Sequence, residues 1–423
     1  MHRSWGRKQA LALALLSLTV LSSPAWASIA LAPGDLVVGE QSPPTVHGVD
    51  RVSGAPKGSC PCSACNSSIR DVMVHGTSEI YVSTPYAIVE IDASSCANRV
   101  VAEIDVPFGF FSGITLDPSG ALLVTADDCT DCVRETFRTY GGVLRVDRSS
   151  GTQSILFRGP PMIGADGLAV APDGLVYVAA QDSDADFDSG VIRIDPANPA
   201  AAAFVAIGDD TAAPIDRTDI ISATDVAIEN AAGPLYVLDT RYRGSTLQDE
   251  LRIVAVDLAG APTSNQTLLT RDLEGVNQDR SSGGLLGIDI AGGTLFTFDH
   301  VFSTGSSSDF AGIVSFVPGV SAGEGTPVTA PSAFYYPSGL AVVPEPESLG
   351  AGAAACLALT LLRSRAVCVR RSAIPPRNRP SPSRRRVRRA RASRDRRGPP
   401  RSRCALRHSG GSRRRARTGS YAS

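Results

Sequence analysis

The chain has 423 residues, of which 40 are glycine and 29 are proline, and only 6% are aromatic. This composition is typical of strands joined by turns and argues against a helical protein. The net charge of −1 hides two opposite parts: residues 28–343 carry 39 Asp and Glu against 16 Lys and Arg, whereas residues 363–423 carry 22 Arg and one Asp. The two parts cannot form one surface. Binding of a nucleic acid usually requires a basic protein surface, so the acidic part argues against a nucleic-acid partner.

Residues 1–27 have the pattern of a secretory signal peptide. A basic start, an apolar stretch and a small-x-small cleavage motif follow in order: Arg3, Arg7 and Lys8, then residues 10–21, then Ala25-Trp26-Ala27. The alternative is a buried helix or a membrane anchor, but the apolar stretch is short for a bilayer span. We therefore expect an exported protein that is cleaved once at the Ala25-Trp26-Ala27 motif, so that the mature chain begins near Ser28.

Export changes how the cysteines are interpreted. Residues 28–343 contain Cys60, Cys62, Cys65, Cys96, Cys129 and Cys132. An even number in an oxidising compartment favours disulfides, although the sequence does not fix their connectivity. Cys129 and Cys132 could pair locally, and the cluster at 60–65 could reach Cys96. The compact cluster also allows a thiolate metal site, but no His lies at ligand spacing beside it.

A short pattern, a small or acidic residue followed by an apolar alternation, recurs six times. Its copies begin at Asp71, Gly113, Gly167, Asp225, Gly287 and Gly339, which are 42 to 62 residues apart. In the first five units a tight turn and a second strand follow, and then a third strand and a weaker fourth strand. Four strands in a unit of this length are typical of a β-propeller blade.

The two ends of the repeat array complement each other. The N-terminal unit has a second strand at 35–38 and a third at 46–52 but lacks a first strand, and the C-terminal unit has only a first strand at 339–342. Joining them completes one blade and removes the exposed sheet edges. The sequence therefore predicts an all-β, six-bladed β-propeller over residues 28–343, closed by a split blade.

The order of strands and turns from Gly167 to Asp195 resembles the NHL-repeat and gluconolactonase-like group of six-bladed propellers. The resemblance covers roughly residues 33–343. It implies the fold and, as an alternative function, a metal-dependent lactonase-like hydrolase. Lactonases of that group hold a divalent metal at the channel mouth with carboxylate and amide oxygens, and Asp166 and Asp225 stand where such ligands could come from. The simpler interpretation is that these aspartates cap turns.

A second candidate metal site is local. Asp182, Asp184, Asp186 and Asp188 alternate along one predicted loop. Alternating carboxylates can wrap Ca²⁺, although Phe187 and Arg193 occupy positions where an EF-hand needs Gly and Glu. A solvated acidic hairpin tip is the alternative. No recognisable nucleophile motif and no phosphate-binding loop appear elsewhere.

The residues after the last strand form an ordered pattern. Pro344-Glu345-Pro346 is followed by an apolar stretch at 349–362 and then by Arg363 and Arg365. Residues 344–366 resemble the PEP-CTERM sorting domain of Gram-negative bacteria. That family implies a short transmembrane helix, processing by an exosortase-type membrane protease, and delivery to the cell surface or the extracellular matrix. The stretch is short for a span, and a linker to a small apolar helix is the alternative.

Residues 367–423 are rich in Arg, Pro and Ser and have too little apolar content to fold. They are interpreted as a disordered extension without function, the minority alternative being an arm that binds polyanions. The sequence as a whole predicts a surface or matrix protein whose propeller is a binding platform for an extracellular polysaccharide or protein. A lactonase-like hydrolase with Ca²⁺ or another divalent metal is the alternative, and the ligand itself does not follow from the sequence.

Overall fold

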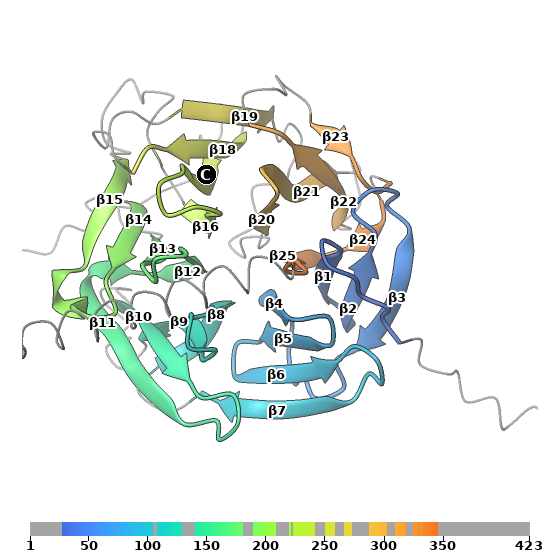
Figure 1. Cartoon of the computed structure of the whole chain (residues 1–423), viewed down its shortest axis with the longest axis horizontal. Helices are drawn as coiled ribbons and strands as arrows, with labels where there is room; N and C mark the ends of the chain where they lie inside the picture. Colours follow the sequence, from blue (N-terminus) through green and yellow to red (C-terminus); the bar gives the residue numbers. More distant parts are fainter. Residues whose placement is uncertain are drawn as a thin grey trace, which may run out of the picture. The chain divides into compact units, whose positions relative to one another are not determined.

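The structure is a computed structural model that describes residues 28–104, 108–128, 140–180, 189–208, 220, 223–241, 250–258, 266–272, 287–302, 309–318, 325–330 and 332–345. These residues form strands β1 to β25 and one short 3₁₀ helix, η1 (Pro199–Ala201). The strands make six sheets arranged around a central axis (Figure 1). The predicted all-β, six-bladed propeller is confirmed.

The first three blades follow one another along the chain, each with its innermost strand first. Blade 1 contains β4 (Asp71–His75), β5 (Glu79–Ser83), β6 (Ala87–Asp92) and β7 (Asn98–Glu103). Blade 2 contains β8 (Phe108–Leu116), β9 (Leu122–Asp128), β10 (Tyr140–Val146) and β11 (Gln153–Ile163). Blade 3 contains β12 (Ala165–Val170), β13 (Val176–Ala180), β14 (Ser189–Ile194) and β15 (Ala203–Gly208).

Blades 4 and 5 continue the pattern, and blade 6 joins the two ends of the array. Blade 4 contains β16 (Ala223–Ala227), β17 (Leu235–Arg241), β18 (Glu250–Val256) and β19 (Gln266–Asp272). Blade 5 contains β20 (Ile288–Ala291), β21 (Thr294–Phe302), β22 (Asp309–Phe316), β23 (Thr326–Pro327) and β24 (Phe334–Tyr335). Blade 6 contains β25 (Pro337–Val342), β1 (Leu36–Gln41), β2 (Pro44–Val49) and β3 (Pro56–Pro61).

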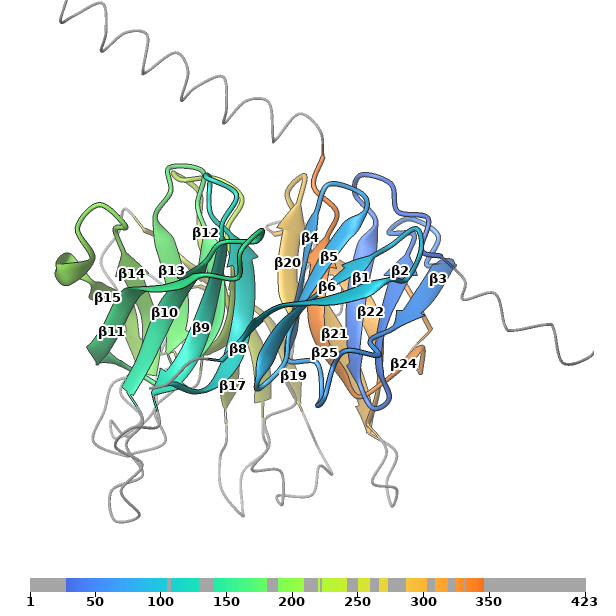
Figure 2. The same cartoon turned by 90° about the horizontal axis from the view of Figure 1, so that it is seen from below.

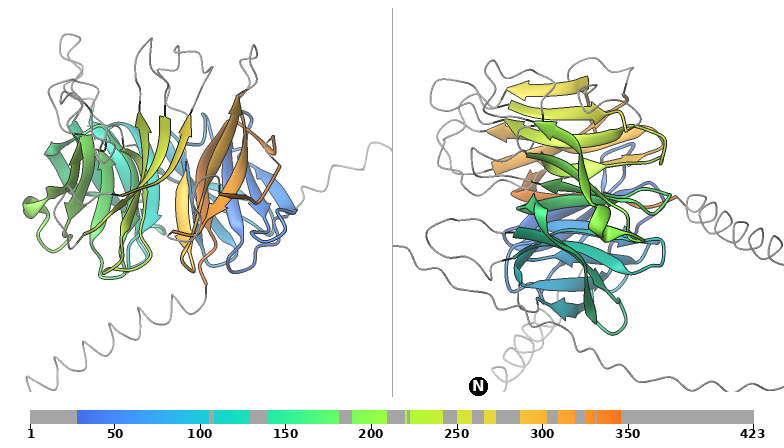
Figure 3. Two further views of the ribbon diagram at one scale, coloured as in Figure 1. Left: turned by 90° about the horizontal axis from the view of Figure 1, so that it is seen from above. Right: turned by 90° about the vertical axis from the view of Figure 1, so that its left-hand side faces the viewer.

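The split blade forms as the sequence predicts. Strand β25 pairs antiparallel with β1, so that Leu36 lies opposite Val342 and Gly39 opposite Gly339. The pairing continues one residue further, because the Val343 N–H donates to the carbonyl of Asp35 at 2.7 Å. In the side views the strands run along the axis of the ring, and the chain after β25 leaves at one face (Figures 2 and 3). Closure therefore depends on the two ends of the repeat array.

Two details differ from the prediction. The expected fourth strand of blade 5 is divided, since β23 and β24 both pair with β22. The strand predicted at 46–52 ends at Val49, because the Asp50 carboxylate accepts the backbone N–H groups of Val52 and Ser53 and starts a turn there. A carboxylate that caps its own turn competes with continued strand pairing.

The core lies between neighbouring blades. Tyr81 on β5 and Met73 on β4 pack with Phe111 and Leu122 of blade 2, and all four side chains are buried. Second strands are buried on both faces, as β13 shows, where every residue is buried. The sequences of such strands are continuous apolar runs, because both faces of the strand pack against a neighbouring sheet. Blade-to-blade packing therefore fixes the inner strands around the channel.

Several predicted features lie outside the described residues. They are the signal peptide with Ala25 and Ala27, the cysteines Cys129 and Cys132, the loop with Asp182, Asp184, Asp186 and Asp188, and everything from Pro346 onward. Within the described part of the chain, no helix is long and apolar enough to cross a membrane.

Candidate functional site

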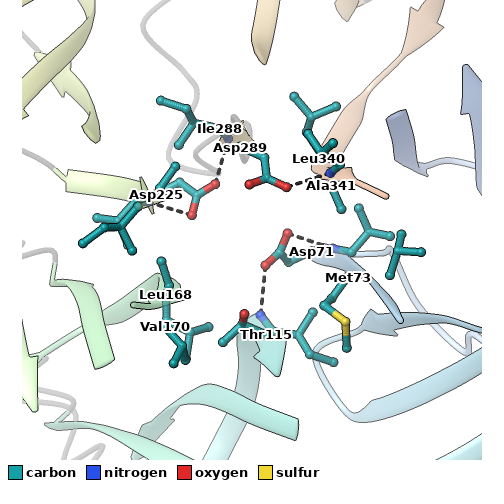
Figure 4. A pocket seen from close by; sticks show the side chains of 18 of the residues that line it. Asp71, Met73, Thr115, Leu168, Val170, Asp225, Ile288, Asp289, Leu340 and Ala341 are labelled. Atoms are coloured by element: carbon teal, nitrogen blue, oxygen red, sulfur yellow. Dashed lines mark hydrogen bonds between the residues drawn. The ribbon is translucent and has the colours of Figure 1, made fainter. Parts of the chain in front are cut away.

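The six inner strands line a central channel. All six begin at the same end of it, and the side chains there form a polar mouth, which we define as Arg70, Ser112, Asp166, Thr224 and Ser338. Further along, the channel widens into a cavity of about 200 Å³ that is lined mostly by aliphatic residues, although the surface it exposes is mainly polar. Figure 4 shows the carboxylates of Asp71, Asp225 and Asp289 pointing into this cavity. The channel is the candidate site because it collects buried ionisable groups.

Asp71 and Asp225 fasten adjacent blades in the same way. One oxygen of Asp71 accepts the N–H of Val72 at 2.7 Å, and the other accepts the N–H of Ile114 in blade 2 at 2.9 Å. Asp225 repeats this with its own neighbour Val226 at 2.8 Å and with Ile288 of blade 5 at 2.9 Å. Each carboxylate therefore joins two inner strands through charge-assisted hydrogen bonds.

Asp289 makes the same kind of bridge from a different position in its repeat. Its carboxylate accepts the N–H of Ile290 and the N–H of Val342 in blade 6, both at 2.7 Å. Asp71 is the first residue of its repeat copy and accepts from Ile114, the second residue of the next copy. Asp289 is the third residue of its copy and accepts from Val342, the fourth residue of the next copy. The offset between adjacent inner strands is therefore the same in both bridges.

Burial controls the ionisation of these groups. It raises the pKa of Asp71 to about 7 and that of Asp289 to about 6, although the two backbone N–H donors of each group act in the opposite direction. Burial, followed by the charge of Asp71, raises the pKa of Asp225 well above its ordinary value. A carboxylate removed from water disfavours its charged form. Near neutral pH the channel therefore holds protonated and ionised carboxyls together.

At two seams that have no aspartate bridge, the inner strands approach each other very closely at a glycine. A Cβ on Gly167 in blade 3 would lie 1.9 Å from Asp225 Oδ1, and a Cβ on Gly339 in blade 6 would lie 2.8 Å from Asp71 Cα. Both distances are far below a normal contact, so the inner strands approach more closely than any other residue allows. The repeat places glycine at these positions because the neighbouring aspartates need that space.

Asp166 fastens the seam between blades 2 and 3. Ser112 donates its hydroxyl to Asp166 Oδ1 at 2.6 Å, and Thr125 donates to the Asp166 carbonyl at 2.5 Å. Burial raises the pKa of Asp166, while the Ser112 hydrogen bond and the charge of Arg70 partly oppose that rise. Asp166 and Arg70 are thus near each other at the polar mouth.

Both residues that the lactonase resemblance singled out therefore lie at the channel. Asp166 belongs to the polar mouth, and Asp225 lies where the mouth meets the wide cavity, close to where a lactonase-like metal site was expected. Each is already engaged, Asp166 by a serine hydroxyl and Asp225 by two backbone N–H groups. Among the residues that the structure describes, no three His, Cys, Asp or Glu side chains are grouped so that they could hold a metal ion.

Two disulfides lie within the described part of the chain. Cys60 on β3 pairs with Cys96 in the turn after β6, and Cys62 pairs with Cys65. The first bond joins the closing blade to blade 1. The predicted reach of the cluster to Cys96 is confirmed, and the thiolate metal site that was its alternative is not formed by these residues. A disulfide across a seam opposes opening of the ring.

A second cross-blade cluster was not anticipated from the sequence. Arg148, in the turn after β10, donates to Glu79 of blade 1 at 3.0 Å, and Glu79 also contacts His75 at 2.9 Å and Tyr81 at 3.1 Å. The Glu79 side chain is 40% exposed, so the cluster is a rim contact of modest strength. It lies on the same seam as the bridge from Asp71 to Ile114.

No family model and no curated protein matches the chain. Several solved structures are similar to the chain at low identity. The structure of a nidogen/laminin complex matches with a TM-score of 0.49 and 11% identity over 73% of this chain and 98% of that one. A protein of unknown function from Bacteroides caccae gives 0.48 and 12% over 74% and 100%. The periplasmic gluconolactonase PpgL of Pseudomonas aeruginosa gives 0.41 and 14% over 73% and 98%. These similarities include binding proteins and lactonases alike, and at such identities they say nothing about activity.

Proposed function

We propose that this protein is an exported bacterial surface or extracellular-matrix protein whose propeller is a rigid binding platform, sorted by an exosortase-type system. The observation that carries the proposal is the Cys60–Cys96 disulfide between blades 6 and 1. Disulfides form and persist in oxidising compartments and are rare in the cytosol. Together with the signal-peptide pattern of residues 1–27, the disulfide supports export.

The position of the Pro-Glu-Pro motif supports sorting from the end of a closed domain. Val343 is fully buried, and Pro344 and Glu345, which follow it directly at the end of the channel, are only partly buried. Glu345 contacts Arg51 at 3.2 Å, and the two side chains are 44% and 35% exposed. A pair so exposed holds the chain weakly. A processing enzyme could therefore draw this segment away without unfolding the last strand.

The exit point also orients the propeller. Pro344 lines the wide cavity of the channel, whereas the polar mouth lies at the other end. A protein attached through its C-terminal segment would present the polar mouth away from the attachment. The inter-blade bridges of Asp71, Asp225 and Asp289 keep the inner strands in register, which suits a rigid platform. This geometry is the basis for proposing a binding role.

The sorting part of the proposal is tested by replacing Pro344, Glu345 and Pro346 together with alanine. The protein is expressed in a Gram-negative strain with and without an exosortase-type protease, and the membrane and surface fractions are compared by immunoblotting. We expect the unchanged chain to be shortened and released from the inner membrane only in the strain with the protease. The triple variant should stay at full length in the membrane.

Arg51→Ala is the matched control, because it removes one contact of Glu345 and keeps the motif intact. It should be processed like the unchanged chain. Processing of the triple variant, or equal processing in both strains, would contradict the sorting proposal.

The alternative is a metal-dependent lactonase-like hydrolase. It is favoured by one observation, namely that Asp166 at the polar mouth and Asp225 just inside it line the same channel and both have raised pKa values. A carboxylate whose pKa approaches neutrality is suited to general acid–base catalysis. This alternative requires a divalent ion at the mouth, which elemental analysis and chelation test directly.

A further inference from the structure

An unusual donor stands at the polar mouth. Arg70 precedes β4, and its backbone N–H donates to the carbonyl of Ser83 at 2.8 Å. Its side-chain Nε is buried and has no hydrogen-bond partner among the described residues. Buried polar groups nearly always have partners, so an unpartnered one marks a position where a further acceptor, either a water molecule or a group of a ligand, is expected.

Acceptors and hydroxyls surround this donor. The polar mouth brings Arg70 together with the carboxylate of Asp166 and the hydroxyl of Ser112. A guanidinium beside a carboxylate offers donors and acceptors at adjacent positions. Two neighbouring hydroxyl groups of a ligand can donate to the carboxylate and accept from the guanidinium at the same time. This arrangement fits a vicinal diol.

Two exposed aromatic side chains lie on the same seam, between blades 1 and 2. Tyr86 is 59% exposed and Phe110 is 37% exposed. The backbone brings them to this seam, because the N–H of Phe111, the residue after Phe110 in blade 2, donates at 3.0 Å to the carbonyl of Pro85, the residue before Tyr86 in blade 1. Large exposed aromatics commonly mark interaction sites. Their flat faces suit the apolar face of a sugar ring.

The charge of the domain narrows the class of ligand. Residues 28–343 carry 39 acidic and 16 basic residues. Such an excess of negative charge repels a polyanion such as a uronate-rich polymer. An uncharged polysaccharide avoids this repulsion and still offers ring faces and vicinal hydroxyls.

We propose that the seam between blades 1 and 2 binds a strand of uncharged polysaccharide, with Tyr86 and Phe110 stacking on sugar rings and Arg70 and Asp166 bonding adjacent hydroxyls. This inference deepens the proposed binding-platform function and rests on it, since it names the class of ligand. The seam runs from the polar mouth to the rim of the ring, so the ligand lies on the face that points away from the C-terminal attachment.

The test is affinity electrophoresis of the full chain, purified after export, in native gels containing dextran, galactomannan, xyloglucan or soluble starch, and alginate as the charged probe. We expect retardation by at least one uncharged polysaccharide and none by alginate. Tyr86→Ala and Phe110→Ala should each weaken the binding about tenfold, because each removes a stacking face. Their melting temperatures should match that of the unchanged chain, since both side chains are exposed.

Tyr335→Ala is the matched control, because Tyr335 is 37% exposed and lies before β25, away from this seam. It should bind like the unchanged chain. Retardation by none of the uncharged polysaccharides, retardation by alginate alone, or unchanged binding by both seam variants would overturn the inference. A chain that is sorted to the surface but fails these gels leaves the sorting proposal intact, so the two failures are distinguishable.

Discussion

The carboxylate of Asp71 in blade 1 accepts the backbone N–H of Ile114 in blade 2 at 2.9 Å and so joins two inner strands across a seam. Asp225 and Asp289 make equivalent bridges from blade 4 to blade 5 and from blade 5 to blade 6. All three lie in the channel, where burial raises their pKa values. These three aspartates, which we call the acidic hub, therefore hold adjacent inner strands together, and their contribution to the stability of the fold depends on pH.

Stability should fall as the pH rises through the range in which these carboxyls ionise. In the unfolded chain they titrate near 3.8, whereas in the folded protein Asp71 titrates at about 7 and Asp289 at about 6. The folded state holds the protons more tightly, so this stabilisation is fully present below about pH 4 and is lost on the way to pH 7. Thermal melts between pH 4.5 and 8 should show a decreasing melting temperature.

Asp71→Asn should flatten that pH dependence, because the amide does not ionise. The matched control is Asp147→Asn, since turn hydrogen bonds hold the pKa of exposed Asp147 below its ordinary value. That replacement should leave the slope between pH 4.5 and 8 unchanged. A melting temperature that rises with pH in the unchanged chain would contradict this description of the hub.

Gly167→Ala should open the seam between blades 3 and 4. The added Cβ would lie 1.9 Å from Asp225 Oδ1 and 2.7 Å from its Cα, so the backbone must move. Overpacking of this kind typically costs about 1–3 kcal/mol. Urea unfolding measures the cost, and Gly233→Ala is the control, since its Cβ would be no closer than 3.2 Å to any neighbour. Equal stability of the two variants would show that this seam is not tight.

The two disulfides should contribute unequally. Cys60 and Cys96 are 36 residues apart, whereas Cys62 and Cys65 are only three apart. Loop-closure entropy gives about 4 kcal/mol for the first and about 2 kcal/mol for the second. Replacing each pair and comparing urea unfolding tests this order. A larger loss for the Cys62–Cys65 pair would contradict it.

Cys96 offers a sharper comparison. It adopts φ 55° at the turn position that glycine occupies in two equivalent turns, with φ 68° at Gly54 and 70° at Gly151. Once the disulfide is gone, only the backbone cost remains there. Cys60→Ala/Cys96→Gly should therefore be more stable than Cys60→Ala/Cys96→Ala by about 1 kcal/mol, because glycine adopts this conformation without strain. The reverse order would show that the turn relaxes when the disulfide is lost.

The buried ion pair of blade 4 gives a further test. Arg252 donates through Nε to Asp239 at 3.0 Å, with a second contact through Nη2, and both side chains are almost fully buried. Asp239→Leu alone should cost about 3–5 kcal/mol, because it leaves a buried charge without this partner. The double variant Asp239→Leu/Arg252→Met should recover most of that loss in denaturant unfolding. A double variant less stable than the single one would contradict this.

The repeat pattern predicted the blade number, the split closure and most strand positions, because each blade buries the same alternation behind the same turn. It could not predict the bridge made by Asp289, which sits two residues later in its repeat copy than Asp71 and Asp225 do. The sequence could not decide the disulfide pairing, because β3 approaches the turn after β6 only when the ring closes. The positive φ at Cys96 could have been inferred from the recurring Asp-x-x-x-Gly turns at Asp50 and Asp147.

For Asp166 and Asp225, the sequence predicted the location of the side chains but not their hydrogen-bond partners. The resemblance placed both at the channel, where they lie. It could not show that backbone N–H groups and Ser112 occupy their oxygens, because those donors come from adjacent blades. An acidic residue that opens an inner strand therefore has two possible roles, metal ligand or fastener, and only the neighbouring strand decides between them.

The most direct test of a binding platform against a metal-dependent hydrolase is metal analysis of the exported protein, followed by thermal melting with and without a chelator. For a binding platform we expect less than one tenth of an equivalent of divalent metal per chain and, with chelator, the same melting temperature. A full equivalent of Ca²⁺ or another divalent ion, together with a lower melting temperature after chelation, would contradict it and favour the hydrolase.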